Sequence, residues 1–263
     1  MTEVSDAFLS RPTEEKFTMF HGRKCRVEWE AHCDKHGPYP QRVSTPESGK
    51  ELCLPGGGCP RCAEERKERA LYGDLAIPPR YARKGFNDFI VTDANRANFE
   101  FMRDYAKNAD SAVSSGRSLI LLGNPGTGKT HLACATLRAF RDKGYSGLYT
   151  TVERMILKIR ETWGTAESEA TAVRRFVDVD LLVLDEVGVQ SGSDNEKKLL
   201  FSVLNARYEN DKPSILMGNL DMDGFTSYLG ERVVDRLREN GGRAKVFDWQ
   251  SFRKSARGAG EGA

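Results

Sequence analysis

The chain has 263 residues, more than one domain of about 150 residues but fewer than two. Hydrophobic residues make up 39% and charged residues 30%, which excludes wholesale disorder; 40 Lys and Arg nearly balance 38 Asp and Glu, which excludes a histone-like binder. No stretch approaches the roughly 20 apolar residues of a membrane span, and the N-terminus lacks an apolar signal-peptide core. We therefore expect a cytoplasmic globular protein with no membrane partner.

The cysteines are concentrated at the N-terminus, where five of the six lie before residue 63. A cytosolic chain is not expected to hold a disulfide framework, so the cluster indicates a metal site. The charged run 63–70, which we expect to form a solvated connecting helix, and the Pro78-Pro79 pair mark a boundary. The sequence therefore predicts a small module over residues 1–75 and a main domain over residues 76–263.

Two ligand-x-x-ligand pairs lie in this module, Cys33 with His36 and Cys59 with Cys62. Such a spacing lets one tight turn direct two side chains at a single tetrahedral ion, and four protein ligands leave no open position. We therefore predict a structural Zn²⁺ site. The 22 residues between His36 and Cys59 are rich in Pro, Gly and Ser, so we expect a loop there with little secondary structure.

Other ligand sets stay open. Cys25 or Cys53 could replace one of the four ligands, or the cysteines could simply be reduced and unligated. Metal is favoured because fewer than 80 residues give a poor core, and ligation of order 10 kcal/mol would stabilise the module. The nearly balanced charge of the module makes a protein partner at least as reasonable as nucleic acid.

Residues 119–130 read LILLGNPGTGKT, an apolar run followed by the pattern G-x-x-x-x-G-K-T, expected by chance about 0.015 times in such a composition. We expect a buried strand, a phosphate-binding loop and a helix over residues 129–141. Lys129 would reach the β- and γ-phosphates, and the Thr130 hydroxyl would bind Mg²⁺. The predicted residues for ATP or ADP are Gly123, Asn124, Pro125, Gly126, Thr127, Gly128, Lys129, Thr130 and His131.

Residues 181–186 read LLVLDE, which predicts a strand buried on both faces in a parallel sheet. Asp185 at its carboxyl end is placed to organise Mg²⁺ beside Thr130. Glu186 can orient and activate an attacking water, which favours hydrolysis over phosphoryl transfer to a small molecule. A turn Asp and a solvated Glu are the alternatives.

Two more segments complete the predicted site. A strand over residues 214–217 is followed by Asn219, which could contact the γ-phosphate or the water, and residues 195–208 have the spacing of a packed crossover helix. Arg232 and Arg236 lie four apart on one face of a helix within residues 229–238. They are either solvated or reach the nucleotide of a neighbouring subunit, as arginine fingers do.

These motifs together resemble the DnaC/IstB branch of the AAA+ ATPases, specifically DnaC-like loaders of the replicative helicase, over about residues 75–255. The most specific part is the box Gly-Glu-Arg-Val-Val-Asp-Arg-Leu at 230–237, followed by 246–253; residues 77–81, Asp185 to Gly188, and Gly218-Asn219 also match. The N-terminal knuckles resemble the zinc-bearing segment of many such proteins. The resemblance implies an α/β AAA+ P-loop NTPase whose parallel sheet is sandwiched by helices, behind a small zinc-binding module.

The resemblance also implies roles. Asn219 falls on the sensor 1 position, Arg236 on the arginine-finger position and Arg232 on the arginine before it. Relatives form open spirals, bind the replicative DnaB-type helicase through the N-terminal part and bind ssDNA through the AAA+ part. Residues 152–177 correspond to inserted helices that face ssDNA, although a solvated face is equally reasonable for their cations Lys158, Arg160, Arg174 and Arg175.

Two features differ among relatives. Enteric loaders grip the helicase with an N-terminal helix that lacks this zinc site, so the docking mode cannot be carried over. About 25 residues follow Arg238, too few for a helical lid, which fits the DnaC/IstB branch. The alternatives to an ATP-hydrolysing loader are an IstB-like transposition helper and a non-catalytic zinc adaptor with a nucleotide switch.

Overall fold

The computed structural model describes residues 9–10, 14–20, 23–33, 35–44, 51–53, 59, 61–62, 73–164, 168–189 and 194–252. The chain divides into two compact units, Met1–Leu71 and Tyr72–Ala263. This division falls four residues before the expected boundary at residue 75. The helix expected over residues 63–70 lies outside the described residues.

The N-terminal unit is an antiparallel sheet of β1 (Leu9–Ser10), β2 (Phe17–Phe20), β3 (Arg23–Cys33), β4 (Gly37–Ser44) and β5 (Glu51–Cys53). Its order is β1-β3-β4-β5, with β2 also paired to β3. The expectation of a loop with little secondary structure between the two knuckles is wrong, because β4 and β5 occupy much of it. The 11-residue β3 gives β4 a partner for its backbone polar groups.

Prolines made β4 hard to recognise from the sequence. Pro38 and Pro40 pair with β3 in a part of β4 that β5 does not reach, because β5 pairs only with Arg42 to Ser44. An edge position tolerates proline, since a missing N–H there removes no ladder hydrogen bond. The core of this unit is small and centres on Cys25, Val27 and Val43.

The larger unit is built on a parallel sheet in the order β10-β6-β9-β8-β7. The strands are β6 (Leu119–Gly123), β7 (Gly147–Thr151), β8 (Leu181–Asp185), β9 (Ser214–Met217) and β10 (Arg243–Phe247). The strands predicted at 119–122, 181–184 and 214–217 are confirmed. Because β9 lies between β6 and β8, the segment after β9 is central to the carboxyl edge of the sheet.

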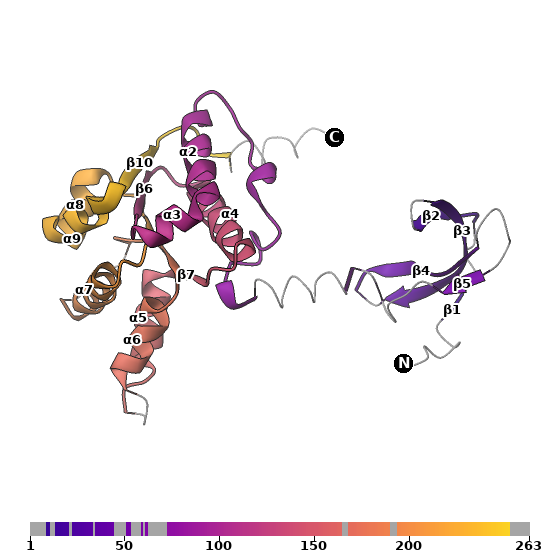
Figure 1. Cartoon of the computed structure of the whole chain (residues 1–263), viewed down its shortest axis with the longest axis horizontal. Helices are drawn as coiled ribbons and strands as arrows, with labels where there is room; N and C mark the ends of the chain where they lie inside the picture. The colour runs from indigo at the N-terminus through magenta and orange to yellow at the C-terminus, as the bar shows by residue number, and fades with distance from the viewer. Residues whose placement is uncertain are drawn as a thin grey trace. The chain divides into compact units, whose positions relative to one another are not determined.

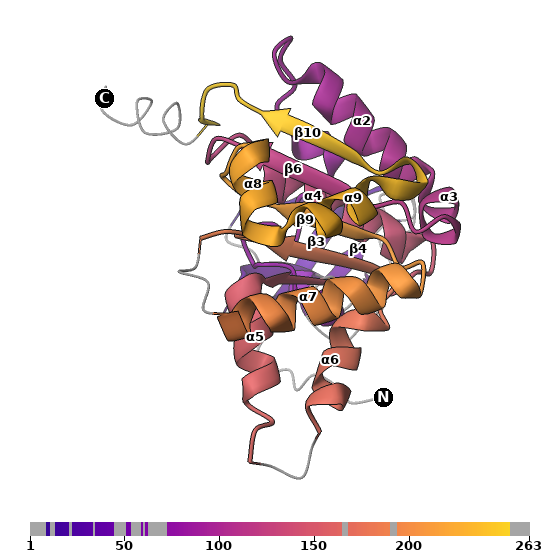
Figure 2. The ribbon, with the colours of Figure 1, turned by 90° about the vertical axis from the view of Figure 1, so that its left-hand side faces the viewer.

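Helices cover both faces of this sheet, as Figures 1 and 2 show, and confirm the predicted sandwich. Leu119 and Leu121 pack toward α2 (Arg96–Lys107), α3 (Ala109–Ser114) and α4 (Lys129–Asp142). Ile120 and Leu122 pack toward the opposite layer of helices. That layer comprises α5 (Val152–Arg160), α6 (Glu169–Val177), α7 (Asp194–Glu209), α8 (Met222–Leu229) and α9 (Glu231–Arg238).

The remaining helical segments are short. In the described part of the chain, the 3-10 turns η2 (Gly73–Leu75) and η3 (Phe86–Asp88) lie before α2, and η4 (Glu239–Gly241) follows α9. The helix expected within residues 229–238 begins only at Glu231, because Gly230 has a φ of 88° and separates α8 from α9. Glycine adopts that backbone conformation at no steric cost. Among the described residues, no helix is both long and apolar enough to cross a membrane.

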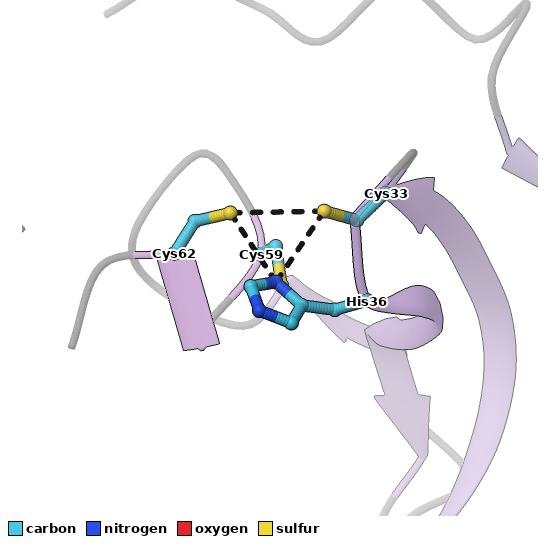
Figure 3. A group of neighbouring side chains, drawn as sticks. All are labelled: Cys33, His36, Cys59 and Cys62. Atoms are coloured by element: carbon cyan, nitrogen blue, oxygen red, sulfur yellow. Dashed lines mark hydrogen bonds between the residues drawn. The ribbon is translucent and has the colours of Figure 1, made fainter. Parts of the chain in front are cut away.

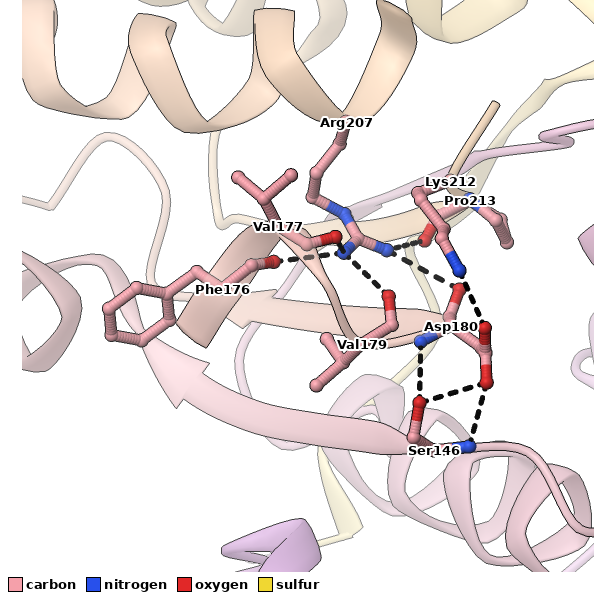
Figure 4. Close-up of polar contacts among 8 residues, drawn as sticks. All are labelled: Ser146, Phe176, Val177, Val179, Asp180, Arg207, Lys212 and Pro213. Carbon is pink, nitrogen blue, oxygen red and sulfur yellow. Dashed lines mark hydrogen bonds and ion pairs between the residues drawn. The ribbon is translucent and has the colours of Figure 1, made fainter. Parts of the chain in front are cut away.

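A buried arginine joins α6, α7 and two strands (Figure 4). Arg207 on α7 is 1% exposed, and its Nη1 donates to the carbonyls of Phe176 and Val177 at 2.9 Å, in the last turn of α6. Its other partners are Val179, Asp180, Pro213 and Ser214. Burial lowers the pKa of Arg207 to about 9, so the guanidinium remains charged at neutral pH. It supplies the donors that a helix C-terminus lacks.

Replacing Arg207 with Met should destabilise the larger unit by about 3–5 kcal/mol, because buried carbonyl groups would lose their donors. Urea unfolding followed by circular dichroism measures this change. Arg96→Met, which removes an exposed arginine paired with Asp93, should shift stability by less than about 0.5 kcal/mol. A loss of under about 1 kcal/mol for Arg207→Met would contradict the structural role.

Candidate functional site

The phosphate loop connects β6 to α4 and needs glycine at two positions for different reasons. Gly123 has a φ of 113°, and a Cβ there would lie 2.4 Å from the Phe247 carbonyl oxygen of β10. Gly128 has a φ of 97°, and a Cβ there would lie 2.5 Å from the Phe89 ring. Positive φ and close packing therefore both require glycine at positions 123 and 128. In a loop that precedes a helix in this way, backbone N–H groups point toward the helix N-terminus, where an anion can bind.

Lys129 lies inside this loop and reaches the neighbouring strand. Its side chain is largely buried, and Nζ donates to the carbonyls of Gly123 at 2.6 Å and Asn124 at 2.8 Å. Nζ also lies 3.1 Å from the Asn219 Oδ1 atom, beyond the end of β9. The ammonium group and the Asn219 amide thus face the same point, as expected for groups that contact one terminal phosphate.

Asp185 accepts hydrogen bonds from two elements through one oxygen. Its Oδ2 atom lies 2.9 Å from Thr130 Oγ1 and 2.8 Å from the Tyr149 hydroxyl, while Oδ1 accepts from the Glu186 N–H at 2.8 Å. Burial, with the nearby charge of Asp185, raises the pKa of Tyr149, so this hydroxyl stays protonated and donates. Hydroxyl and carboxylate oxygens are hard ligands that suit Mg²⁺, so the residues present fit that ion.

Glu186 lies beside this carboxylate in an unusual backbone conformation. Its φ is 60°, which is uncommon for a residue with a Cβ, and its side chain is exposed at the end of β8. Strained conformations of this kind cluster at functional sites because the surrounding structure must hold them. The following Val187 is fully buried, and its N–H donates to the Met217 carbonyl of β9 at 2.9 Å, which anchors the turn.

A cavity of about 340 Å³ joins these groups. Its lining includes Lys129, Thr130, Asp185, Glu186 and Asn219, and also Arg80, Tyr81, Phe89, Ile90 and Phe252. The aromatic and cationic groups in this second set suit a purine base. The sequence assigned these residues no role, although Arg80 and Tyr81 belong to the 77–81 segment and Phe252 to the 246–253 box already noted.

His131 belongs to the wall of this cavity. Its Nε2 atom lies 2.9 Å from the Gly85 carbonyl oxygen, and its ring packs 5.5 Å from Phe89 and 6.1 Å from Tyr81. Burial lowers the pKa of His131, which favours the neutral imidazole. His131 therefore lines the cavity as a packed ring, and its predicted contact with the nucleotide stays a prediction.

The segment after β10 wraps around the phosphate loop. Asn124 Nδ2 donates to the Asp248 carbonyl at 3.1 Å, Trp249 Nε1 donates to the Thr127 carbonyl at 3.1 Å, and the Phe252 N–H donates to the Gly126 carbonyl at 3.0 Å. These hydrogen bonds explain the 246–253 sequence box, because residues within it fix the conformation of the phosphate loop.

The two predicted arginines lie apart from this cavity. Arg236 donates to Asn205 Oδ1 and lies 4.7 Å from the centre of the Tyr208 ring, both on α7. It lines a separate cavity with Leu204 and Leu237, and Arg232 is exposed on α9. The structure thus brings together Lys129, Thr130, Asp185, Glu186 and Asn219, but neither arginine lines the cavity of its own chain's phosphate loop.

The N-terminal unit brings the four predicted ligands together (Figure 3). The Sγ atoms of Cys33 and Cys62 are 3.7 Å apart, and His36 Nδ1 lies 3.4 to 3.7 Å from the three sulfur atoms of Cys33, Cys59 and Cys62. Tetrahedral Zn–S and Zn–N bonds of about 2.3 and about 2.0 Å require separations of about 3.8 and about 3.5 Å. The residues present therefore fit a zinc ion.

The thiols of this cluster differ in acidity. A hydrogen bond from the Lys35 backbone lowers the pKa of Cys33 to about 6, whereas its contact with Cys33 raises the pKa of Cys62 to about 11. Cys25 does not join the cluster, since it is fully buried beside Val27 and Val43. The Cys53 side chain lies outside the described residues, so that alternative ligand stays a hypothesis.

The fold and this cavity define an AAA+ P-loop nucleotide-binding domain. Residues 64–248 match the family described as IstB-like ATP binding protein, and the chain belongs to this IstB/DnaC-like family. The replicative helicase loader DnaC of Escherichia coli strain K12 is 31% identical over 209 residues, which are 77% of this chain and 84% of that protein. DnaC of Buchnera aphidicola subsp. Baizongia pistaciae is 34% identical over 195 residues, covering 73% and 78%.

Solved structures agree on the fold. The crystal structure of the DnaC helicase loader superimposes with a TM-score of 0.58 at 24% identity, over 66% of this chain and all of that one. That level of identity supports the architecture alone. The resemblance to the DnaC/IstB branch is therefore confirmed by sequence, and the AAA+ fold by both comparisons.

Tyr149→Phe should raise the Mg²⁺ concentration needed for half-maximal ATP binding by about three- to tenfold, because Asp185 loses one hydrogen bond worth about 1 kcal/mol. Binding of a fluorescent ATP analogue over a Mg²⁺ titration measures this. Tyr105→Phe is the matched control, since its buried hydroxyl donates to the Arg117 carbonyl away from the site. An equal shift in both variants would contradict a specific role for Tyr149.

The zinc site predicts about one Zn²⁺ per chain by elemental analysis of the purified protein. Cys59→Ser should lose that metal and the thermal transition of the N-terminal unit, because ligation stabilises so small a core. Cys25→Ala, which changes a cysteine outside the cluster, should retain the metal. Full metal content in Cys59→Ser would refute this ligand set.

Proposed function

We propose that this protein is an ATP-dependent loader of the replicative DNA helicase. The observation that carries the proposal is the arrangement of Lys129, Thr130, Asp185, Glu186 and Asn219 around one cavity, in a chain 31% identical over 77% of its length to a replicative helicase loader. An intact phosphate loop and carboxylate pair are what ATP hydrolysis requires.

Hydrolysis would use this chain's groups in distinct roles. Lys129 and the N–H groups of residues 123–130 bind the phosphates and offset their charge, while Asn219 orients the terminal phosphate. Thr130 and Asp185 hold Mg²⁺, which supplies further charge neutralisation when bound. Glu186, exposed at the cavity, accepts a proton from the attacking water.

We propose that Arg236 acts on the nucleotide of a neighbouring copy. It lies outside its own chain's nucleotide cavity, and Asn205 and Tyr208 hold its guanidinium on α7. A finger supplied in this way requires a self-assembled oligomer, such as an open spiral, in which each α9 faces the next cavity. Arg232, exposed on the same helix, would support that interface.

The proposed role as a helicase loader also implies contacts with the helicase and with single-stranded DNA. The zinc-binding module, residues 1–75 in the sequence prediction, would bind a DnaB-type helicase in the cytoplasm. Single-stranded DNA would contact α5 and α6, where Arg174 and Arg175 are exposed, as is Lys158, which is paired with Glu161. Arg160 on α5 is paired with Glu196 of α7.

The IstB-like family description favours a second candidate, an ATP-dependent transposition helper. Such a protein would bind duplex DNA and a transposase rather than a helicase. The loader ranks first because relatives described as replicative helicase loaders match 73% to 77% of the chain at 31% to 34% identity.

Glu186→Gln should bind ATP normally but lower turnover by about 10²- to 10⁴-fold, because the attacking water loses its base. The ATP-bound variant should co-elute with the replicative helicase of the same genome in size-exclusion chromatography. Glu100→Gln, an exposed carboxylate on α2, should match the wild type in both assays. Unchanged turnover in Glu186→Gln would contradict catalysis by Glu186 and support a non-catalytic nucleotide switch. Binding only to duplex DNA and a transposase would contradict the helicase-loader proposal and support the transposition helper.

A further inference from the structure

A second cavity, of about 770 Å³, lies along the outer edge of the parallel sheet. It is lined by residues of β7, α5 and α6, by Val179 after α6, and by Asp74 and Ala76 in and after η2, a turn that also contacts β7. None of these residues lines the nucleotide cavity. It is larger than the nucleotide cavity, and ATP hydrolysis does not use it. What it could bind follows from the strand that forms its floor.

Five consecutive residues, Ser146 to Thr150, line this cavity. Successive side chains of a strand point to opposite faces, so a cavity touched by five in a row must run along the strand's backbone edge. The Leu181 N–H donates to the Ser146 carbonyl at 3.1 Å. Because parallel ladders alternate, the N–H and C=O groups of Gly147 and Tyr149 are directed away from β8 and toward the cavity.

The two edge strands of the sheet, β10 and β7, differ in the hydrogen bonding of their outward backbone groups. On β10, the Asn98 side chain of α2 donates to the Val246 carbonyl at 2.6 Å and so blocks that edge. Within the described parts of the chain, no group is hydrogen bonded to the outward backbone of Gly147 or Tyr149. A strand edge of this kind is a template for pairing with another extended chain.

The walls of the cavity suit apolar side chains. Leu157 on α5 is 51% exposed, and Leu148 and Phe176 complete one wall. An apolar side chain at a cavity is an anchor point for a partner residue that would otherwise face water. An added strand on β7 would direct alternate side chains toward this wall.

Charge at the cavity is positive. Three cations line it, Arg154, Lys158 and Arg175, against two carboxylates, Asp74 and Glu161. Asp74 is paired with Arg141, which lies outside the lining, whereas Glu161 is paired with Lys158 and so offsets one of the three cations. The surplus cationic charge attracts acidic groups on a partner.

We propose that β7 and this cavity bind an extended, acidic and apolar segment of a partner protein by β-strand addition. The pattern of the edge favours a peptide over single-stranded DNA. Alternating C=O and N–H groups need alternating donors and acceptors, which a peptide backbone provides, whereas a sugar–phosphate backbone offers only acceptors. The site does not depend on ATP hydrolysis, so it can be tested apart from the helicase-loader proposal.

The test uses the full chain and a peptide labelled at its N-terminus, fluorescein-Asp-Glu-Val-Thr-Val-Glu-Val-Asp-amide, with fluorescence anisotropy as readout. A second peptide with Pro in place of the central Val lacks one N–H and should bind at least about tenfold more weakly. Hydrogen exchange at the Gly147 and Tyr149 amides should slow when the first peptide binds. Equal binding of both peptides, or no slowing at β7, would overturn strand addition.

A matched pair of variants locates the site. Leu157→Glu places a carboxylate at an exposed position of the cavity wall and should weaken the acidic peptide by at least about tenfold. Val246→Glu changes an equally exposed apolar residue at the blocked edge and should bind as the wild type does. Equal losses in both variants would refute the site. The proposal would also be refuted if the peptide did not bind and a labelled oligothymidylate did, with its binding weakened by Leu157→Glu. That result would identify the cavity as a groove for nucleic acid.

Discussion

The Asp185 carboxylate connects the helix and strands that form the nucleotide-binding cavity. The Asp185 Oδ2 atom accepts from Thr130, which begins α4, and from Tyr149, which lies on β7. The phosphate-loop helix, the strand before Asp185 and the outermost strand therefore meet at one oxygen. Because β9 lies between β6 and β8, Asn219 also reaches this point and contacts Lys129. A displacement of any of these elements would therefore move the side chains that we expect to contact the phosphates.

The surroundings of this site are stabilised from several directions. Hydrogen bonds with residues 248–252 hold the phosphate loop, and Phe89, which also contacts the Phe252 ring, packs against Gly128. Arg207 fixes the end of α6 to the sheet through the carbonyls of that helix. α7 also carries Asn205 and Tyr208, which hold Arg236. One helix thus supports both the inserted helices and the arginine that we propose acts on a neighbouring copy.

The N-terminal unit follows a different physical rule. Among its described residues, the buried apolar cluster consists of Cys25, Val27 and Val43, and a small antiparallel sheet gains little stability from so small a cluster. Four ligand atoms within 4.8 Å of one another provide the alternative, since metal ligation can replace the missing apolar burial. We therefore expect the two units of the chain to differ in what stabilises them: burial on both faces of a sheet in the larger unit, and metal ligation by the four-residue cluster in the smaller one.

The sequence alone determined whatever depends on local pattern. Continuous apolar runs at 119–122 and 181–184 predicted buried parallel strands, and fixed spacings predicted the phosphate loop and the grouping of Cys33, His36, Cys59 and Cys62. The strand β4 was missed because its prolines resemble a loop until the pairing partner is known.

Only the tertiary structure decided which distant groups meet. Nothing in the local sequence around Tyr149 shows that its hydroxyl reaches Asp185, that Arg207 satisfies the carbonyls of α6, or that β7 is the open edge of the sheet. Such contacts depend on strand order and on packing across the sheet, which are set by the whole chain rather than by any segment of it.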